Sequence, residues 1–367
     1  MIFWVENKNS ISYKDFFEDL KKKKTNSNNE AYKYFLNLII NLSFDLKFND
    51  IDTLIKQLKI NSKDKFFKVQ TSGTSSFQKN INVNLSNCIR HVKYSKEKRT
   101  WALCYPYGSF ASTQVFFQSF LNLEKLVYCF GESYKRIIDL LIGEKITNLT
   151  CTPSFLNMIL INSTKKISSI KSITVGGERL SINICKNYKS IFFNSKLINI
   201  YSSTETGSLL YSKDNYFQIP ERYKELIKIV NDEIIFHKSL LNHAKENKVE
   251  NDWFYSGDIV KNLNKNTFEF ISRKSSFLNT GGYKVNLDEI EEKINLTSGI
   301  IDAHVYGKEN SILGTIICAD IVSNYKSVKE IKLILNNKLD KYKVPKIINI
   351  VKEIKLEKSG KKSKWTK

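Results

Sequence analysis

The sequence has few of the patterns that mark metal sites, disulfide scaffolds or membrane spans. Its six cysteines are at least 16 residues apart and form no CxxC pair, and its four histidines have no ligand-like spacing. We therefore expect no zinc site or disulfide framework, and reduced thiols in a cytoplasmic protein. No run of 18 apolar residues occurs, and the start, MIFWVENKNS, does not resemble a signal peptide. No membrane span is expected.

Arginine is also scarce, because it occurs at only six positions and lysine supplies 52 of the 58 basic residues. The formal net charge of +21 over 367 residues raises the question of nucleic-acid binding. Recognition of bases and phosphates relies heavily on the planar arginine fork, whereas scattered lysines produce a diffuse field. The joint abundance of Lys, Asn and Ile is typical of an A/T-rich genome. We therefore expect no nucleic-acid partner.

Only four prolines and 14 glycines interrupt the chain, while 41% of the residues are hydrophobic, which is enough for a real core. In the middle of the chain, short apolar runs bounded by turn residues alternate with segments of helical periodicity. This alternation predicts an α/β layer with a largely parallel sheet. The expected strands are Leu126–Phe130, Ile146–Thr152, Ser172–Val175 and Lys196–Tyr201, and the expected helices include Ser133–Gly143 and Pro153–Ile161.

After about residue 230 the pattern changes to shorter strands separated by turns. A helix is expected at Leu287–Ile294, a second at Val328–Leu339, and a strand at Ile347–Val351 before a very basic end. This order predicts a compact α+β unit of about 90 residues. A polar turn at Ser272–Phe277 separates the two patterns and is the expected domain boundary.

Five short segments contain residue types suited to phosphate or nucleotide chemistry. Taken singly, each has an ordinary interpretation as a hydroxyl-rich turn, a capped helix start or a Gly-Asp turn. The first has several hydroxyl and backbone donors around a glycine, but it is not a Walker A loop. The segments are Thr71–Ser76 with Lys79, Asn199–Gly207, Tyr255–Asp258, Arg273–Val285 and Ser359–Lys361.

Together, in this order, the five segments resemble the motifs of the adenylate-forming superfamily, which includes acyl-CoA and aryl-CoA synthetases. TSGTSSFQKN is similar to the family's phosphate loop, IYSSTE to its Y-G-x-T-E block, and YSGD to its T-G-D. RKSSFLNTGGYKV resembles the block that contains the hinge, and SGK the motif with the catalytic lysine. The resemblance implies a large N-terminal domain at residues 1–274, with mostly parallel sheets and helices. It also implies a small mobile α+β domain at residues 275–367.

The resemblance implies ATP-dependent activation of a small carboxylic acid as an acyl-adenylate, followed by transfer to a thiol. Lys361 would be the catalytic lysine, Thr204 would contact the α-phosphate, and Glu205 would hold Mg²⁺. Asp258, assisted by Arg273, would accept the ribose hydroxyls. Gly176-Gly177-Glu178 resembles the family's G-G-E/A turn, which implies that Gly177 and Glu178 line the adenine pocket. The other nucleotide-binding residues that the resemblance implies are Thr71, Ser72, Gly73, Thr74 and Lys79 for the phosphates and Tyr201 for stacking on adenine.

In the family, the small domain rotates between the two half-reactions about a hinge, which falls here on Ser275. After rotation, Gly281, Gly282, Tyr283 and Lys284 would approach the channel for the pantetheine thiol. The acceptor implied is CoA or the phosphopantetheine of an acyl carrier protein, and the residues leave both open.

The sequence departs from the family pattern at Ser202, which replaces the Gly beside Tyr201, and in three further places. Ser76, Gln78 and Asn80 replace the Gly, Pro and Gly of the phosphate loop, and no histidine occurs in the block Cys104–Ser109. About 70 residues precede the phosphate loop, so the N-terminal lobe is expected to be trimmed, and a homodimer is one way to replace the missing part. The altered loop leaves open an alternative, a catalytically degenerate nucleotide-binding homologue with a regulatory or scaffold role.

Overall fold

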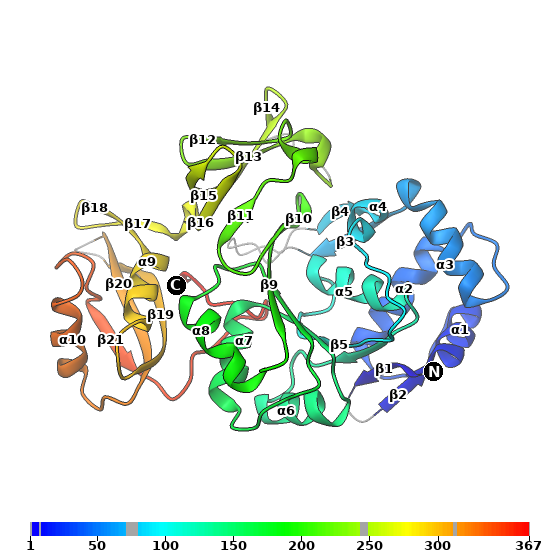
Figure 1. Cartoon of the computed structure of the whole chain (residues 1–367), viewed down its shortest axis with the longest axis horizontal. Helices are drawn as coiled ribbons and strands as arrows, with labels where there is room; N and C mark the ends of the chain where they lie inside the picture. Colours follow the sequence, from blue (N-terminus) through cyan, green and yellow to red (C-terminus); the bar gives the residue numbers. More distant parts are fainter. Residues whose placement is uncertain (1, 7–8, 71–79, 243–248, 311–313, 367) are drawn as a thin grey trace.

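The computed structural model describes residues 2–6, 9–70, 80–242, 249–310 and 314–366. These residues form three large β-sheets and one separate pair of strands, β3 (Phe66–Gln70) with β4 (Asn80–Asn84). Figure 1 shows the first sheet in the middle of the molecule, the second above it and the third to one side. The α/β class and the small second domain expected from the sequence are confirmed.

The first sheet has eight strands in the order β10-β9-β8-β7-β5-β6-β1-β2. The strands from β9 across to β1 are parallel, and only the two edge strands are antiparallel. The carboxyl ends of the parallel strands therefore meet at one edge of the sheet. The strands are β1 (Ile2–Glu6), β2 (Asn9–Ser12), β5 (Thr100–Leu103), β6 (Lys125–Tyr128), β7 (Asn148–Cys151), β8 (Ser172–Gly176), β9 (Lys196–Ser203) and β10 (Gly207–Ser212).

Successive side chains of each strand point to opposite faces of the sheet, and helices bury the apolar side chains on both faces. On one face, residues such as Leu149 and Ile173 pack against α6 (Tyr134–Gly143), α7 (Pro153–Asn162) and α8 (Ile182–Ile191). The other face packs against a cluster rich in aromatic residues. The helices of that side are α1 (Tyr13–Lys22), α2 (Glu30–Leu42), α3 (Ile51–Ile60), α4 (Leu85–Ile89) and α5 (Phe110–Phe120).

The second sheet is antiparallel, in the order β11-β16-β15-β13-β12, with β14 paired to β15. Its core contains phenylalanines of four strands and Tyr201, which comes from the end of β9. The strands are β11 (Tyr216–Gln218), β12 (Ile227–Val230), β13 (Glu233–His237), β14 (Val249–Glu250), β15 (Trp253–Asn264) and β16 (Thr267–Arg273).

The third sheet, in the order β18-β17-β20-β19-β22 with β21 on β20, has its own apolar core with α9 and α10. None of the described helices is both long enough and apolar enough to cross a bilayer. The elements are β17 (Phe277–Thr280), β18 (Tyr283–Asn286), α9 (Leu287–Asn295), β19 (Ile300–Asn310), β20 (Gly314–Ser323), α10 (Val328–Asn336), β21 (Ile347–Ile350) and β22 (Trp365–Thr366).

Candidate active site

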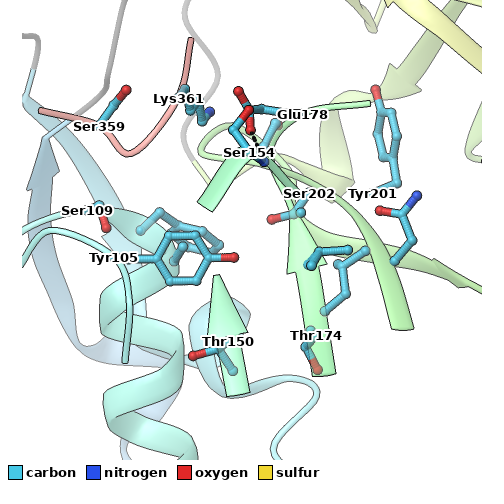
Figure 2. A pocket seen from close by; sticks show the side chains of 18 of the residues that line it. Tyr105, Ser109, Thr150, Ser154, Thr174, Glu178, Tyr201, Ser202, Ser359 and Lys361 are labelled. Atoms are coloured by element: carbon cyan, nitrogen blue, oxygen red, sulfur yellow. Dashed lines mark hydrogen bonds between the residues drawn. The ribbon is translucent and has the colours of Figure 1, made fainter. Parts of the chain in front are cut away.

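A cavity of about 2190 Å³ opens at the carboxyl ends of the parallel strands. Figure 2 shows Tyr105, Thr150, Thr174 and Ser202 around it, with Glu178 and Lys361 at the opposite side. The lining comes from strands of the first sheet and the loops after them, from α5 and α9, from the second sheet and from the end of the chain. The strand ends, Ser275 and residues 357–359 and 361–365 therefore face a single space.

Lys361 reaches this cavity on a turn closed by two backbone hydrogen bonds, from Gly360 N to Glu357 O (2.9 Å) and from Glu357 N to Lys361 O (2.8 Å). Its side chain lies against Gly177, where a Cβ atom would be 3.1 Å from both Cε and Nζ of Lys361. Gly177 follows β8 and has a φ of +85°, which favours glycine. The glycine therefore provides both the turn and the space for the lysine.

Two side chains of the large domain hold the turn that carries Lys361. Thr152, which caps the N-terminus of α7, donates from Oγ1 to the carbonyl of Gly360 (2.6 Å). Glu178 accepts from the backbone N–H of Lys362 (3.2 Å) and, through its other oxygen, from that of Ser154 (3.1 Å; Figure 2). These bonds fix the position of the turn relative to β7 and β8.

Burial lowers the pKa of Lys361, and the positive charge of Arg273 acts in the same direction. Glu178, Asp258 and Glu357 oppose this effect because their carboxylates favour the ammonium form. A desolvated ammonium group at the mouth of a parallel sheet is suited to hold an anion.

Asp258, Arg273 and Tyr201 form a second group of side chains on the cavity wall. Arg273 Nε lies 2.8 Å from Asp258 Oδ1, and the hydroxyl of Tyr201 donates to Asp258 Oδ2. The register of β15 and β16 places Asp258 opposite Arg273. Burial raises the pKa of Asp258, as do Glu205 and Glu233, while Arg273 and Tyr201 lower it.

The ring of Tyr201 is only 6% exposed and packs edge-on or tilted against Phe217, Phe236, Phe268 and Phe270. The ring is therefore fixed between the first and second sheets, with its hydroxyl committed to Asp258. It also lines the cavity, so one part of the ring faces the space in which we expect a nucleotide.

Thr204 and Glu205 lie in the turn between β9 and β10, and both line the cavity. Asn242 holds this turn, because its side chain donates to Thr204 O (2.8 Å) and its backbone N–H to Glu205 O (2.6 Å). Among the described residues, no three His, Cys, Asp or Glu side chains come together as a metal site. One carboxylate is nevertheless compatible with Mg²⁺, which proteins often bind through one or two carboxylates plus phosphates of a substrate.

The predicted phosphate-loop residues Thr71, Ser72, Gly73, Thr74 and Lys79 lie outside the described residues. The strands on either side of the segment pair with each other, Gln70 opposite Asn80. Gln70 also donates from its backbone N–H to Gly108 O (2.8 Å) and lines the cavity. Gln70, the described residue that precedes the segment, is therefore at the cavity.

Ser275 lies in a short 3-10 turn between β16 and β17 and lines the cavity. The predicted thiol-channel residues Gly281, Gly282, Tyr283 and Lys284 form the turn and start of the β17–β18 hairpin, and none of them lines the cavity. Tyr283 instead stacks on Tyr342, with ring centroids 4.3 Å apart. In this arrangement the small domain presents Lys361, and not the hairpin, to the cavity.

The observed groups fit a nucleotide with a sugar hydroxyl and phosphates. Asp258 Oδ1 is buried and accepts no well-aligned hydrogen bond from the described residues, so it can accept one from a hydroxyl. Lys361 supplies a positive charge, and the bare backbone at Gly177 allows a ligand to approach closely. Thr152 and Lys362 were missed from the sequence, where the only signal was the position of Thr152 as a helix cap after a strand.

Comparisons with known proteins agree with this arrangement. The model of the AMP-binding enzyme family matches residues 9–228, and that of its C-terminal domain matches residues 289–361. Surfactin synthase subunit 3 of Bacillus subtilis is 24% identical over 349 residues, which are 83% of this chain and 27% of that protein. A 2-succinylbenzoate–CoA ligase of Listeria monocytogenes is 29% identical over 248 residues, 62% of this chain and 52% of the ligase. The chain thus spans about a quarter to a half of these relatives.

Solved structures show the same fold at low sequence identity. An o-succinylbenzoate CoA synthetase from Bacillus subtilis, in complex with its acyl-adenylate intermediate, has a TM-score of 0.67 at 15% identity. The similarity covers 99% of this chain and 94% of the synthetase chain. The structure of that synthetase with ATP and a magnesium ion has a TM-score of 0.62 at 17% identity, with coverages of 98% and 82%.

Proposed function

Since the chain belongs to the AMP-binding enzyme family, we propose that it is an ATP-dependent ligase that activates a small carboxylic acid as an acyl-adenylate. The acyl group then passes to a thiol, either of CoA or of the phosphopantetheine on a carrier protein. The observation that supports this proposal most is the position of Lys361, whose ammonium group lies against Gly177 in the same cavity as Asp258 and Arg273.

Adenylation brings the carboxylate of the acid and the α-phosphate together, so the site must offset two negative charges. Lys361 binds both anions with its ammonium group and holds them in reach of each other. Arg273 holds the carboxylate of Asp258, which accepts hydrogen bonds from the ribose. Thr204 donates to the α-phosphate. When bound, ATP supplies the phosphorus that the acid attacks, and Mg²⁺ supplies positive charge to the phosphates.

We assign the other predicted residues to nucleotide binding. Tyr201 stacks on the adenine, Gly177 and Glu178 border the adenine pocket, and Glu205 holds Mg²⁺. The segment 71–79 surrounds the phosphates with the donors of Thr71, Ser72, Gly73 and Thr74 and the charge of Lys79.

For the second half-reaction, we propose that residues 275–367 rotate as a unit about Ser275. Rotation withdraws Lys361 and brings the hairpin with Gly281, Gly282, Tyr283 and Lys284 to the cavity, where it borders the path of the thiol. The acid–thiol ligase would act in the cytoplasm, and a homodimer is one form in which it would do so.

The proposal is tested by ATP–pyrophosphate exchange with a panel of short aliphatic, hydroxy, aryl and amino acids. Lys361→Ala should abolish exchange, because the proposal relies on the Lys361 ammonium group to offset the charge of the two reacting groups. Lys355→Ala, an exposed lysine six residues earlier, is the control and should keep it. The acceptor is then identified by offering CoA or a holo carrier protein to the pre-formed adenylate.

The second candidate is a catalytically degenerate nucleotide-binding homologue with a regulatory or scaffold role, which the unusual residues of the phosphate loop favour. Measurable ATP binding without exchange for any acid would support this candidate over the ligase. The absence of both pyrophosphate exchange and ATP binding would contradict both candidates.

A further inference from the structure

Two lysines beside Lys361 have side chains that are largely, though not fully, buried in the small domain. The side chain of Lys362 is 8% exposed and that of Lys364 is 19% exposed, although lysine is rarely buried unless its charge is paired. Both residues line the same cavity as Lys361, but the nucleotide site proposed above assigns no role to either. Their surroundings therefore need a separate explanation.

The partners of these lysines are three carboxylates, Asp288 and Glu291 of α9 and Asp302 of β19, which we call the acid cluster. Lys362 Nζ lies 2.9 Å from Asp302 Oδ1 and 3.5 Å from Glu291 Oε1. Lys364 Nζ lies 2.8 Å from Glu291 Oε2 and 2.9 Å from Asp288 Oδ1. Glu291 is thus shared by both ammonium groups.

Glu291 carries a charge that depends on both lysines. Burial would raise the pKa of its carboxyl, but Lys364 and Lys362 reverse the effect and lower it to about 2. Its Oε2 also accepts the backbone N–H of Val305 (2.9 Å), which fixes the carboxylate against β19. The ammonium groups therefore meet a permanently ionised, positioned partner.

The backbone of the same segment is attached to β19. Gly307 donates to Lys364 O (3.0 Å), Trp365 pairs with Gly307 in parallel register, and His304 hydrogen-bonds to the carbonyl of Ser363. Alternate side chains of an extended segment point to opposite sides. Lys362 and Lys364 consequently face the acid cluster, while Lys361 faces the large domain.

We propose that Lys362 and Lys364, held by Glu291, are positioning residues that set the place of the Lys361 ammonium group in the cavity. This inference rests on the proposed role of Lys361 in adenylation. Attachment of residues 362–365 to the acid cluster and to β19 leaves only the turn at residues 357–361 to span the distance to Gly177. The rotation of the small domain is then transmitted directly to Lys361.

The central test is Glu291→Gln, compared with Glu289→Gln on the same helix. The side chain of Glu289 is 42% exposed and pairs with Lys293 and Lys343, outside the acid cluster. Glu289→Gln is therefore the same chemical change on the same helix without loss of a member of the acid cluster. Glu291→Gln should lower kcat of pyrophosphate exchange about 100-fold, the effect of a misplacement of about 1 Å. Thioester formation from a synthetic acyl-adenylate should change less than about threefold, because that step does not use Lys361.

Hydrogen exchange of the backbone amides at residues 357–366 is measured on the same proteins. This measurement does not require the carboxylic acid substrate to be known. Faster exchange in Glu291→Gln than in Glu289→Gln, together with the selective loss of adenylation, supports the proposal. The proposal is overturned if Glu291→Gln and Glu289→Gln behave alike in pyrophosphate exchange and in hydrogen exchange. It is also overturned if Glu291→Gln loses adenylation and thioester formation equally and has a lower melting temperature.

If Glu291→Gln does not fold, Lys364→Met serves instead, because Lys362 keeps Asp302 and Glu291 as partners. It should show the same selective loss at smaller size, and the same outcomes overturn the proposal. If the wild-type protein shows no ATP–pyrophosphate exchange with any acid of the panel, the proposed function fails. Faster amide exchange in Glu291→Gln would then still support the attachment of residues 362–365 through Glu291, but the proposed role of this attachment in adenylation would be overturned.

Discussion

Gly177 lies against the end of the Lys361 side chain, so that a methyl group on Gly177 would be 3.1 Å from both Cε and Nζ. Such contacts are tighter than side chains normally accept, and the flexible lysine would have to move. The glycine thus defines how close the ammonium group comes to the ends of β7 and β8.

Gly177→Ala should lower kcat of pyrophosphate exchange about tenfold, because it displaces Lys361 by a few tenths of an ångström. The positive φ should cost about 1–2 kcal/mol of stability in addition. Gly131→Ala, at a φ of +89° with no atom within 4 Å of the new Cβ, is the matched control. It should lose stability alike and keep its activity. Equal kcat losses in the two variants would contradict a contact with Lys361.

The rate of adenylation should fall at alkaline pH below 10.5, the ordinary pKa of lysine. Burial lowers the pKa of Lys361, so the ammonium group that binds the anions is lost earlier than usual. The alkaline limb of kcat/KM in pyrophosphate exchange measures this titration in the unliganded enzyme. Lys361→Arg, if active, should move the limb upward, and an unchanged limb would exclude Lys361 as its origin.

The same shift has the opposite effect on stability. Between the lowered pKa and 10.5, the unfolded chain binds one more proton at Lys361 than the folded chain, so this residue contributes stability that rises with pH. The contribution should be missing in Lys361→Met. Melting curves of both proteins across this range check the sign.

Asp258→Asn should weaken ATP binding about 10- to 100-fold, because a charged acceptor for the ribose becomes a neutral one. The melting temperature should not fall at neutral pH. The folded state raises the pKa of Asp258 above its ordinary value of 3.8. Ionisation of this carboxyl therefore lowers the free energy of unfolding increasingly as the pH rises above 3.8. Calorimetric titration with ATP and thermal unfolding measure the two effects. Asp252→Asn, at an exposed pair with Lys238, should change neither.

Thr152→Val should reduce adenylation, because the bond from Oγ1 to the carbonyl of Gly360 is lost and the turn carrying Lys361 loses an anchor. Loss of the α7 cap should also cost about 1 kcal/mol of stability. Thr152→Ser keeps both bonds and should be nearly normal. Ser133→Ala removes a comparable cap from α6 and should lower stability alone. Activity in Thr152→Val equal to that of Ser133→Ala would refute the anchoring role.

Several features could be predicted from the sequence because they depend on local pattern. The strands around residues 126, 148, 173 and 198 were found from short apolar runs, and α6 and α7 from helical periodicity. The order of the five motifs identified the family. The family resemblance assigned Asp258 and Arg273 to the same ribose, and the register of β15 and β16 brings the two residues together.

Other features required the tertiary structure because they join distant segments. Lys362 and Glu178 are 184 residues apart in sequence and share a hydrogen bond. The hydroxyl of Thr152 gave no sequence signal beyond a helix cap. Lys362 and Lys364 belong to the very basic end of the chain, and nothing in their spacing distinguishes them from its other lysines.

The sequence by itself determined the order of strands and helices and the chemical groups available to the site, since both follow from residue types and their spacing. Only the tertiary structure decided which groups meet. The parallel strands end at one edge and expose Gly177 there, while β19 and α9 provide the carboxylates for Lys362 and Lys364. These choices depend on long-range packing and on burial of charge, which no local pattern of residues records.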